Sequence, residues 1–168
     1  MKPKNSAIFF DSVETALGTF RMAATARGLV GIDFPNGYAQ GKKRKAISRP
    51  AKRILNQTKH FLRAYLQGKR LESIQIPVDW RIFSPFDRRV LKALKKIRAG
   101  QVVTYSELAE LAKSPRASRA VGSALHRNPI PIFIPCHRVV RKDSTLGGYR
   151  AGLRWKRILL NLEKGKSI

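Results

Sequence analysis

Cysteine is almost missing from this chain of 168 residues, in which Cys136 is the single one. One cysteine excludes an internal disulfide and a cysteine-rich zinc site. Histidine is also scarce, and the three present, His60, His126 and His137, are too few and too scattered for a convincing metal cluster. We therefore expect no metal and no other cofactor.

Long apolar runs are absent as well. No stretch approaches the roughly 18 consecutive apolar residues that a membrane-spanning helix needs. The N-terminus shows no charged and then apolar segment that ends in a small-residue cleavage site. These absences predict a cytoplasmic protein with no membrane contact. Hydrophobic residues still make up 43% of the chain, enough to form the core of one domain or of two small ones.

Acidic residues are few: 10 Asp and Glu stand against 35 Lys and Arg, which gives a net charge of +25. Such an excess favours a polyanionic partner, and nucleic acid first of all, through contacts with its phosphates. Both halves of the chain are basic, so one basic tail does not explain the charge. A membrane surface would require an exposed helix with a wide apolar face opposite a basic one, and no predicted helix requires that arrangement.

The first half of the chain predicts a small sheet and one helix. Strand patterns cover residues 8–10, 18–25 and 29–34, and the last two read as a hairpin. Residues 48–68 place apolar side chains on one helical face, with Ser48 as the cap and Gly68 as the end. A further strand is predicted at 74–78, at a sheet edge because of Pro77. The basic segment 41–45 fits a phosphate-binding arm or a mobile solvated loop.

Helix signals dominate the second half. Ser84 followed by Pro85 predicts a helix from there to Gly100. Thr104 and Glu107 have the spacing of a capping box, which predicts a short helix through residue 113. Residues 114–115 predict the start of another helix that reaches about residue 127. Two short helices joined by a tight turn favour a DNA-binding helix-turn-helix, or else close helix packing inside the protein.

The lone cysteine has a distinctive setting. Cys136 follows an apolar, β-branched and aromatic run at 130–135, which predicts a buried extended segment, and His137 follows it directly. A thiol reacts as its thiolate, and an adjacent imidazole or cationic groups can lower its pKa. Composition alone leaves open the alternative of an inert, buried cysteine.

The residues around Cys136 point to one family. Residues 135–140 read Pro-Cys-His-Arg-Val-Val; Asn128-Pro129 precedes them and Gly147-Gly148-Tyr149 follows. This string resembles the active-site signature of the O6-alkylguanine-DNA alkyltransferases, which transfer an alkyl group from guanine to their own cysteine. The similarity extends from about residue 84 to 165.

The resemblance implies an α/β (α+β) fold and a domain organisation. A small ribonuclease-H-like domain, a sheet with a helix, would occupy residues 1–80. A helical DNA-binding and alkyl-transfer domain with a helix-turn-helix would occupy residues 81–168. The resemblance further implies a monomer that binds double-stranded DNA and uses no cofactor.

Catalytic roles are also implied by the resemblance. Cys136 would accept the alkyl group, His137 would deprotonate it through a water molecule, and Glu163 would orient the histidine. Asn128 would brace the turn and the active-site loop. Tyr105 would rotate the phosphate and contact the base.

The same resemblance assigns DNA contacts to the predicted second helix of the helix-turn-helix. Arg119 would take the place of the flipped nucleotide, while Ser118, Ala120 and Gly122 would line the minor groove. Minor-groove entry suits a protein that must find damage in any sequence, because the readout of that groove is degenerate.

The substrate pocket is implied at Tyr105, Val139, Tyr149 and Arg150. In the family, the backbone carbonyls of Cys136 and Val139 accept from the exocyclic amine of guanine, and the backbone N–H of Arg150 reaches the guanine oxygen. Many relatives have serine where this chain has Arg150, a change that leaves a backbone contact intact and alters the rim of the pocket.

The implied reaction is a single irreversible transfer from guanine O6 to Cys136, with O4-alkylthymine as a minor substrate. The main alternative is a non-catalytic, alkyltransferase-like damage sensor, although such proteins usually carry tryptophan in place of the cysteine. A Cys-His hydrolase would need an oxyanion hole and leaves the net charge unexplained. An architectural minor-groove protein would bind DNA without Cys136 and take up no alkyl group.

Overall fold

A computed structural model describes residues 7–35, 47–69 and 75–166 of the chain. The chain divides into two compact units, Met1–Ile82 and Phe83–Ile168, which we call unit 1 and unit 2. Each unit is described by itself. The basic segment predicted at 41–45 lies outside the described residues.

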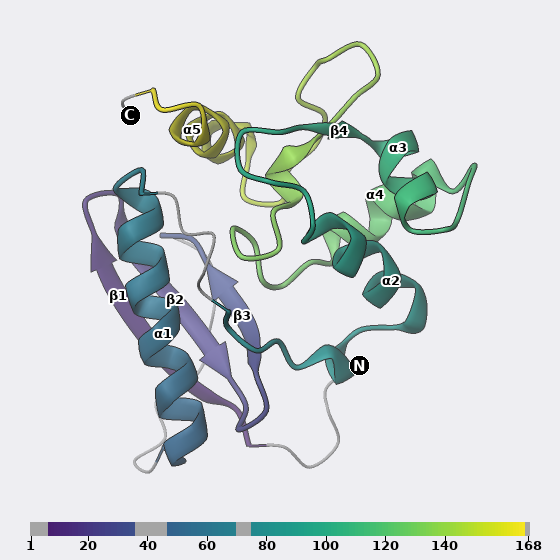
Figure 1. The fold of residues 1–168 in the computed structure, drawn as a ribbon. Helices are drawn as coiled ribbons and strands as arrows, with labels where there is room; N and C mark the ends of the chain where they lie inside the picture. Colours follow the sequence, from purple (N-terminus) through teal and green to yellow (C-terminus); the bar gives the residue numbers. More distant parts are fainter. Residues whose placement is uncertain (1–6, 36–46, 70–74, 167–168) are drawn as a thin grey trace. The chain divides into compact units, whose positions relative to one another are not determined.

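Unit 1 contains a three-stranded antiparallel sheet in the order β1-β2-β3 (Figure 1). The strands are β1 (Phe9–Thr15), β2 (Gly18–Ala24) and β3 (Leu29–Asp33). Alternate residues of β2, namely Phe20, Met22 and Ala24, are buried, as period-2 patterning requires. The predicted first strand at 8–10 was too short, because β1 pairs with β2 along its whole length although its own sequence alternates weakly.

Helix α1 (Arg49–Leu66) packs against β1 and β2 through a buried apolar face (Figure 1). Gly68 follows it in the left-handed conformation, with φ at +76°, as expected for a helix end. Ser48 occupies the N-cap position, but its side chain makes no capping hydrogen bond, so that part of the prediction was wrong. The reason is local: Pro50 at the second helical position has no N–H, which removes one of the two usual donors to a capping side chain.

The strand predicted at 74–78 is not formed by its described residues. Instead, Val78 makes an isolated parallel bridge to Leu29. The Leu29 N–H donates to the Pro77 carbonyl at 2.8 Å, and the Asp79 N–H donates to the Leu29 carbonyl at 3.1 Å. Gly28 permits this approach, because a Cβ there would lie 2.3 Å from the Asp79 nitrogen. Pro77 lacks an N–H, so the ladder cannot extend.

Unit 2 is built from short elements, most of them helical (Figure 1). They are α2 (Pro85–Leu94), β4 (Val103–Thr104), α3 (Tyr105–Leu111), α4 (Ser118–His126), the 3-10 turn η2 (Cys136–Arg138), β5 (Val139–Val140) and α5 (Leu153–Glu163). Helices α2, α3 and α4 pack on one another, and β4 pairs with β5 in parallel. A further 3-10 turn, η1 (Trp80–Ile82), ends unit 1.

The ends of two helices differ from the predictions. Helix α2 ends at Leu94 and not at Gly100, because i→i−3 hydrogen bonds from Lys96 and Ile97 tighten the chain into turns. Helix α4 begins at Ser118 and not at residues 114–115. Ser114 instead donates back to α3, and Pro115 lies in the turn that follows.

Helix α3 ends in a Schellman motif. The Lys113 N–H donates to the Glu110 carbonyl and the Ser114 N–H donates to the Ala109 carbonyl, while Lys113 adopts a φ of +53°. Arg116 also has a positive φ, +66°, so the chain cannot start a new helix before that residue. The capping box at the other end of α3 is confirmed: Thr104 Oγ1 accepts from the Glu107 N–H at 3.2 Å, and Glu107 Oε2 accepts from the Thr104 N–H at 2.6 Å.

The expected mixed α+β class, a small N-terminal sheet with a helix followed by a helical half, is confirmed. No helix among residues 7–35, 47–69 and 75–166 is both long and apolar enough to cross a membrane.

Candidate active site

Cys136 begins the 3-10 turn η2 and is 7% exposed. The turn runs directly into β5, and β5 pairs with β4 through Val103–Val139 and Thr104–Val140. Since β4 leads straight into α3, this pairing places Tyr105, the first residue of α3, near the cysteine. The short β4–β5 pairing therefore connects the turn η2, which carries the thiol, to helix α3.

Asn128 connects the end of α4 to the cysteine. Its Nδ2 donates to the Ile134 carbonyl at 2.9 Å and to the Cys136 sulfur at 3.2 Å. Its Oδ1 accepts from the Ile130 N–H at 3.0 Å. A side chain with two donors and one acceptor, 2% exposed, thus fixes the loop 128–136 from inside.

His137 and Glu163 form a buried pair in which His137 Nε2 lies 2.8 Å from Glu163 Oε1. The glutamate is the last residue of α5, and its side chain is 2% exposed. Arg138 donates to the same carboxylate through Nη2 at 2.7 Å and through Nε at 3.0 Å, and the Gly100 N–H donates to it at 3.1 Å. Arg138 Nη1 also donates to the Ile97 carbonyl. One carboxylate therefore ties η2, α5 and the segment after α2 together.

The electrostatics of these groups define their protonation. Burial raises the pKa of the Cys136 thiol, against the opposing effect of the hydrogen bond from Asn128. Burial lowers the pKa of His137 despite its bond to Glu163. Burial also raises the pKa of Glu163, but the hydrogen bonds from His137 and Arg138 outweigh it and hold that pKa well below its usual range. The resting site is a neutral thiol beside a neutral imidazole and a carboxylate.

Tyr105 lies between α4 and the 147–148 turn. A Cβ added at Gly147 would lie 3.0 Å from the Tyr105 hydroxyl, and one added at Gly122 would lie 3.7 Å from its ring. Burial raises the pKa of Tyr105, and charge on Cys136 would raise it further, while Arg141 lowers it. A hydroxyl of this kind stays protonated and can donate.

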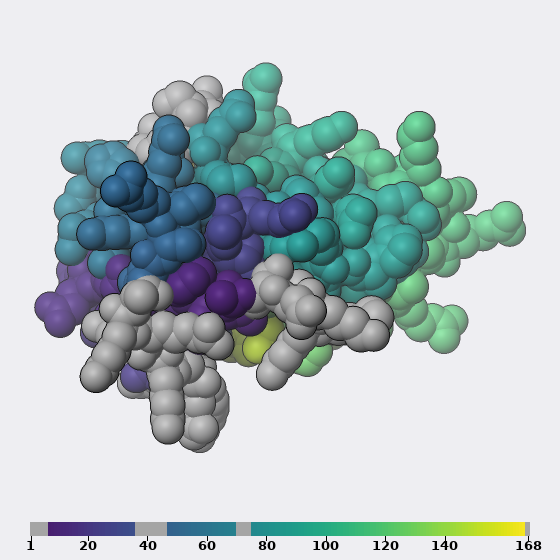
Figure 2. Space-filling model, turned by 90° about the horizontal axis from the view of Figure 1, so that it is seen from below, coloured from purple at the N-terminus to yellow at the C-terminus, as the bar shows by residue number. Residues whose placement is uncertain are grey.

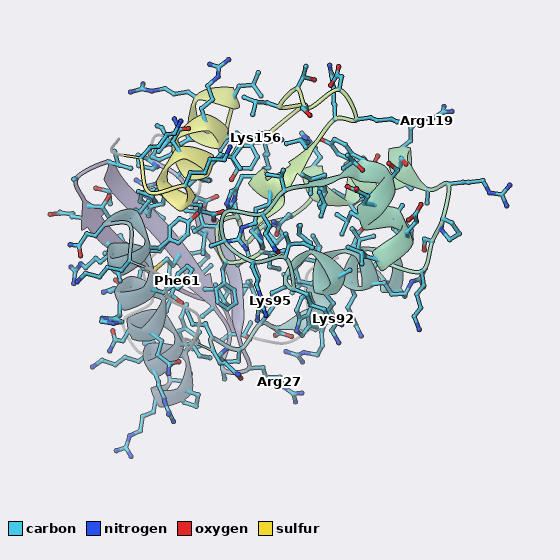
Figure 3. The ribbon with its side chains drawn as sticks, turned by 45° about the horizontal axis from the view of Figure 1, so that its top comes forward. Arg27, Phe61, Lys92, Lys95, Arg119 and Lys156 are labelled. Atoms are coloured by element: carbon cyan, nitrogen blue, oxygen red, sulfur yellow. The ribbon has the colours of Figure 1, made fainter. Side chains whose placement is uncertain are left out.

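Sequence reasoning missed Lys156. Its side chain is fully buried, and Nζ donates to the carbonyls of Val139 at 2.5 Å, Gly148 at 3.5 Å and Leu146 (Figure 3). Burial lowers its pKa to about 8. A signal was present: Lys156 stands three residues before the buried Leu159 and seven before Glu163, which places it on the inward face of α5.

The residues assigned to the minor groove lie on α4. Arg119 and Ala120 are exposed, Ser118 and Gly122 are half-buried, and Val121 faces the core. Figure 3 shows the Arg119 side chain pointing away from the ribbon. This end of α4 thus presents small side chains and one long cation.

Val139, Tyr149 and Arg150 are the remaining residues predicted to form the substrate pocket. The Tyr149 ring stands edge-on to His137, with centroids 6.5 Å apart. Val139 is buried, and its carbonyl already accepts from Lys156, which leaves one lone pair for a second donor. Arg150 is exposed, with Nη1 3.5 Å from the Asn128 carbonyl. The described residues contain no group of three or more His, Cys, Asp or Glu side chains placed to hold a metal ion.

Models of known protein families match both halves of the chain. The ribonuclease-like domain of 6-O-methylguanine DNA methyltransferase matches residues 8–80, and the DNA binding domain of the same family matches residues 85–165. The chain belongs to this family. These matches confirm the resemblance and the ribonuclease-like character of the first half.

Individual relatives cover almost the whole chain. A methylated-DNA–protein-cysteine methyltransferase of Haemophilus influenzae is 51% identical over 95% of this chain and 88% of its own length. One from Methanosarcina barkeri is 40% identical over 94% and 98%. The structure of Mycobacterium tuberculosis OGT in complex with DNA superimposes with a TM-score of 0.77 at 31% identity, covering 94% of this chain and 93% of that one. The expected enzyme class, a methylated-DNA–protein-cysteine methyltransferase of DNA repair, is thereby confirmed.

Proposed function

We propose that this methyltransferase repairs O6-alkylguanine in duplex DNA by one irreversible transfer of the alkyl group to the sulfur of Cys136. The observation that carries the proposal is the buried line of contacts from Asn128 through Cys136 and η2 to His137 and Glu163. O4-alkylthymine is a minor substrate in this proposal. The protein acts as a cytoplasmic monomer, with residues 1–80 as the ribonuclease-H-like domain and 81–168 as the domain that binds DNA and transfers the group.

DNA binding comes first. Helices α3 and α4 form the helix-turn-helix, and α4 enters the minor groove with Ser118, Ala120 and Gly122 against it. Arg119 fills the space of the extruded nucleotide, which offsets part of the few kcal/mol that unpairing and unstacking cost. The exposure of Arg119 and the small side chains around it support this role.

The flipped base then meets the pocket. Backbone groups of Cys136, Val139 and Arg150 read its edge, and Tyr149 borders it beside His137. Tyr105 contacts the base with a hydroxyl that stays protonated, because burial raises its pKa. The second lone pair of the Val139 carbonyl remains available for the exocyclic amine of guanine.

Transfer requires a thiolate, and burial disfavours one at rest. Glu163 accepts from His137 Nε2, so the proton leaves the thiol for His137 Nδ1 through a bridging water. The sulfur attacks the alkyl carbon, an S–C bond forms, and the C–O6 bond breaks with its electron pair on guanine. Tyr105 supplies a proton to the base and regains one from the His137 side, so the thiol proton ends on the guanine. No described group could cleave the resulting thioether.

Intact-mass spectrometry tests the proposal. Wild type and Cys136→Ala are mixed with excess duplex carrying one O6-methylguanine, and with the same duplex without the lesion. We expect a gain of about 14 Da, a methyl in place of a hydrogen, only for wild type with the lesion, stopping at one equivalent. No gain, together with equal lesion binding by both proteins, would establish the damage-sensor alternative instead.

A further inference from the structure

A basic groove in unit 1 takes no part in the proposed function. It is a cavity of about 560 Å³ lined by Arg27, Arg49, Arg53, Gln57, Gln75 and Pro77 among others, and none of its described lining residues is acidic. Its volume falls within the range of roughly 300–1,000 Å³ that is typical of ligand sites. Figure 2 shows the face on which blue side chains from the start of α1 lie beside indigo side chains of the β2–β3 segment.

The charges at the start of α1 destabilise the helix. Arg49 and Arg53 are one turn apart on the same face, where like charges repel, and Arg49 lies at the positive end of the helix dipole. The first turn holds no acidic residue, and the Ser48 side chain makes no capping bond. A bound anion would offset these unfavourable features together.

The opposite wall of the groove is rigid. The turn that carries Arg27 is closed by the Thr25 N–H donating to the Gly28 carbonyl at 2.9 Å and by the Arg27 N–H donating to Thr25 Oγ1 at 3.1 Å. Thr25 Oγ1 in turn donates to Asp79 Oδ2 at 2.8 Å. Figure 3 shows the Arg27 side chain pointing outward from this turn.

Asp79, which lies next to this turn, forms an ion pair with Arg81 and not with an arginine of the groove. Its side chain is 2% exposed and accepts from Arg81 Nη2 at 2.6 Å and Arg81 Nε at 2.8 Å. The hydrogen bonds from Arg81 hold the pKa of Asp79 below its usual range, which keeps the carboxylate paired. Among the described residues, none forms an ion pair with the side chains of Arg27, Arg49 or Arg53.

We infer that this groove binds phosphate groups of the DNA backbone, as a second DNA contact made by the ribonuclease-like unit. The three arginines that line the groove carry guanidinium groups, which match phosphate oxygens in charge and in hydrogen-bond geometry, and two glutamine amides add donors. The contact reads no sequence, since phosphates carry none. It extends the proposed function, in which residues 81–168 alone hold the duplex.

A double-variant comparison tests the inference. Arg27→Ala/Arg53→Ala removes two groove cations, whereas Lys52→Ala/Arg63→Ala removes two exposed cations of α1 that lie outside the groove. Binding of an undamaged, fluorescein-labelled duplex is followed by anisotropy over a salt series. For the groove variant we expect roughly tenfold weaker binding and a log K against log salt slope that is smaller by about 1 to 2, because each lost phosphate contact removes about 0.9. Identical curves for the two double variants would overturn the inference.

Two further measurements separate the explanations. Thermal unfolding must show both double variants folded, and methyl uptake at saturating lesion DNA must still reach one equivalent, which keeps this test independent of the reaction at Cys136. Inorganic phosphate is titrated by NMR as the small-ligand probe. If the groove variant loses phosphate binding but keeps the wild-type DNA curve, the site serves a small phosphorylated molecule and the DNA assignment is wrong.

Discussion

The two units bury polar groups in opposite ways. In unit 1 the described buried polar residues are Thr25, Thr58 and Asp79, which sit under a regular sheet and one long helix. In unit 2 an aspartate, an asparagine, a histidine, an arginine and a lysine are buried around short elements. All four described non-glycine residues with positive φ also belong to unit 2. Both units have an apolar core, but in unit 2 buried cationic side chains that donate to backbone carbonyls and to one carboxylate also join the short elements.

Replacing Lys156 should have the largest effect, because it removes the donor shared by three carbonyls. Lys156→Met leaves buried carbonyls without a charged partner, which should lower the free energy of unfolding by about 3 kcal/mol or more and reduce methyl transfer sharply. Urea unfolding and single-turnover mass analysis measure the two effects. Arg157→Met, at the adjacent exposed position of α5, is the control and should behave as wild type. Equal urea midpoints for the two variants would refute the contrast between the units.

Glu163→Gln should have the next largest effect. It should lower the free energy of unfolding by about 2–4 kcal/mol, because Arg138 is left buried without its carboxylate. The pH dependence has a definite sign. The folded-state pKa of Glu163 is depressed, so its stabilisation is complete above the unfolded value of about 4.3 and is lost as pH falls below it. The free energy of unfolding of the wild type, measured in urea, should therefore fall below about pH 5. That of the variant should fall less over the same range. Parallel pH profiles would show that Glu163 does not carry the acid sensitivity.

Gly28→Ala examines the packing of unit 1. The added Cβ would lie 2.3 Å from the Asp79 nitrogen and 2.4 Å from the Val78 carbonyl carbon, so the bridge between Leu29 and Val78 must open. We expect a loss of about 1–3 kcal/mol, with one equivalent of methyl uptake retained. Gly148→Ala is the matched control, since nothing lies within 4 Å of its added Cβ. Loss of methyl uptake in Gly28→Ala but not in Gly148→Ala would mean that the packing of unit 1 affects the reaction in unit 2.

Lys113→Gly should have the smallest effect and the opposite sign. Lys113 occupies the left-handed position of the Schellman motif, with a φ of +53°, where glycine is unstrained. We expect a gain of about 0.5–1 kcal/mol in urea unfolding. Lys96→Gly, an exposed position of the turn after α2 without a positive φ, should not stabilise. A destabilised Lys113→Gly variant would show that the side chain and not the backbone decides this position.

Local signals in the sequence predicted local structure well. The capping box of Thr104 and Glu107 and the glycine end at Gly68 depend on neighbours within a few residues, and both appear in the structure. Strand β1 was underestimated because its extent is set by pairing with β2, a partner that its own pattern does not reveal. The start of α4 was misplaced because a serine before a proline reads as a cap, while the left-handed backbone at Lys113 and Arg116 leaves no mark in the sequence.

In the candidate site, too, contacts between residues that are distant in the sequence were not predicted. Family resemblance identified residues that the structure brings together around Cys136, including His137, Asn128 and Glu163. It did not show that Arg138 shares the Glu163 carboxylate or that Lys156 occupies the Val139 carbonyl. Both are long cations in a very basic chain, where most such residues are solvated, and only three-dimensional placement distinguishes the buried ones.

Asn128 has one more consequence, which concerns chemical ageing. Asparagine side chains deamidate spontaneously when the backbone nitrogen of the following residue attacks the amide, and conversion here would put a carboxylate against the Cys136 sulfur. The following residue is Pro129, whose nitrogen bears no hydrogen and cannot attack the side-chain amide in this way. The amide at the centre of the site is therefore protected by its neighbour in the chain, so an unused molecule can wait for a lesion without losing this contact.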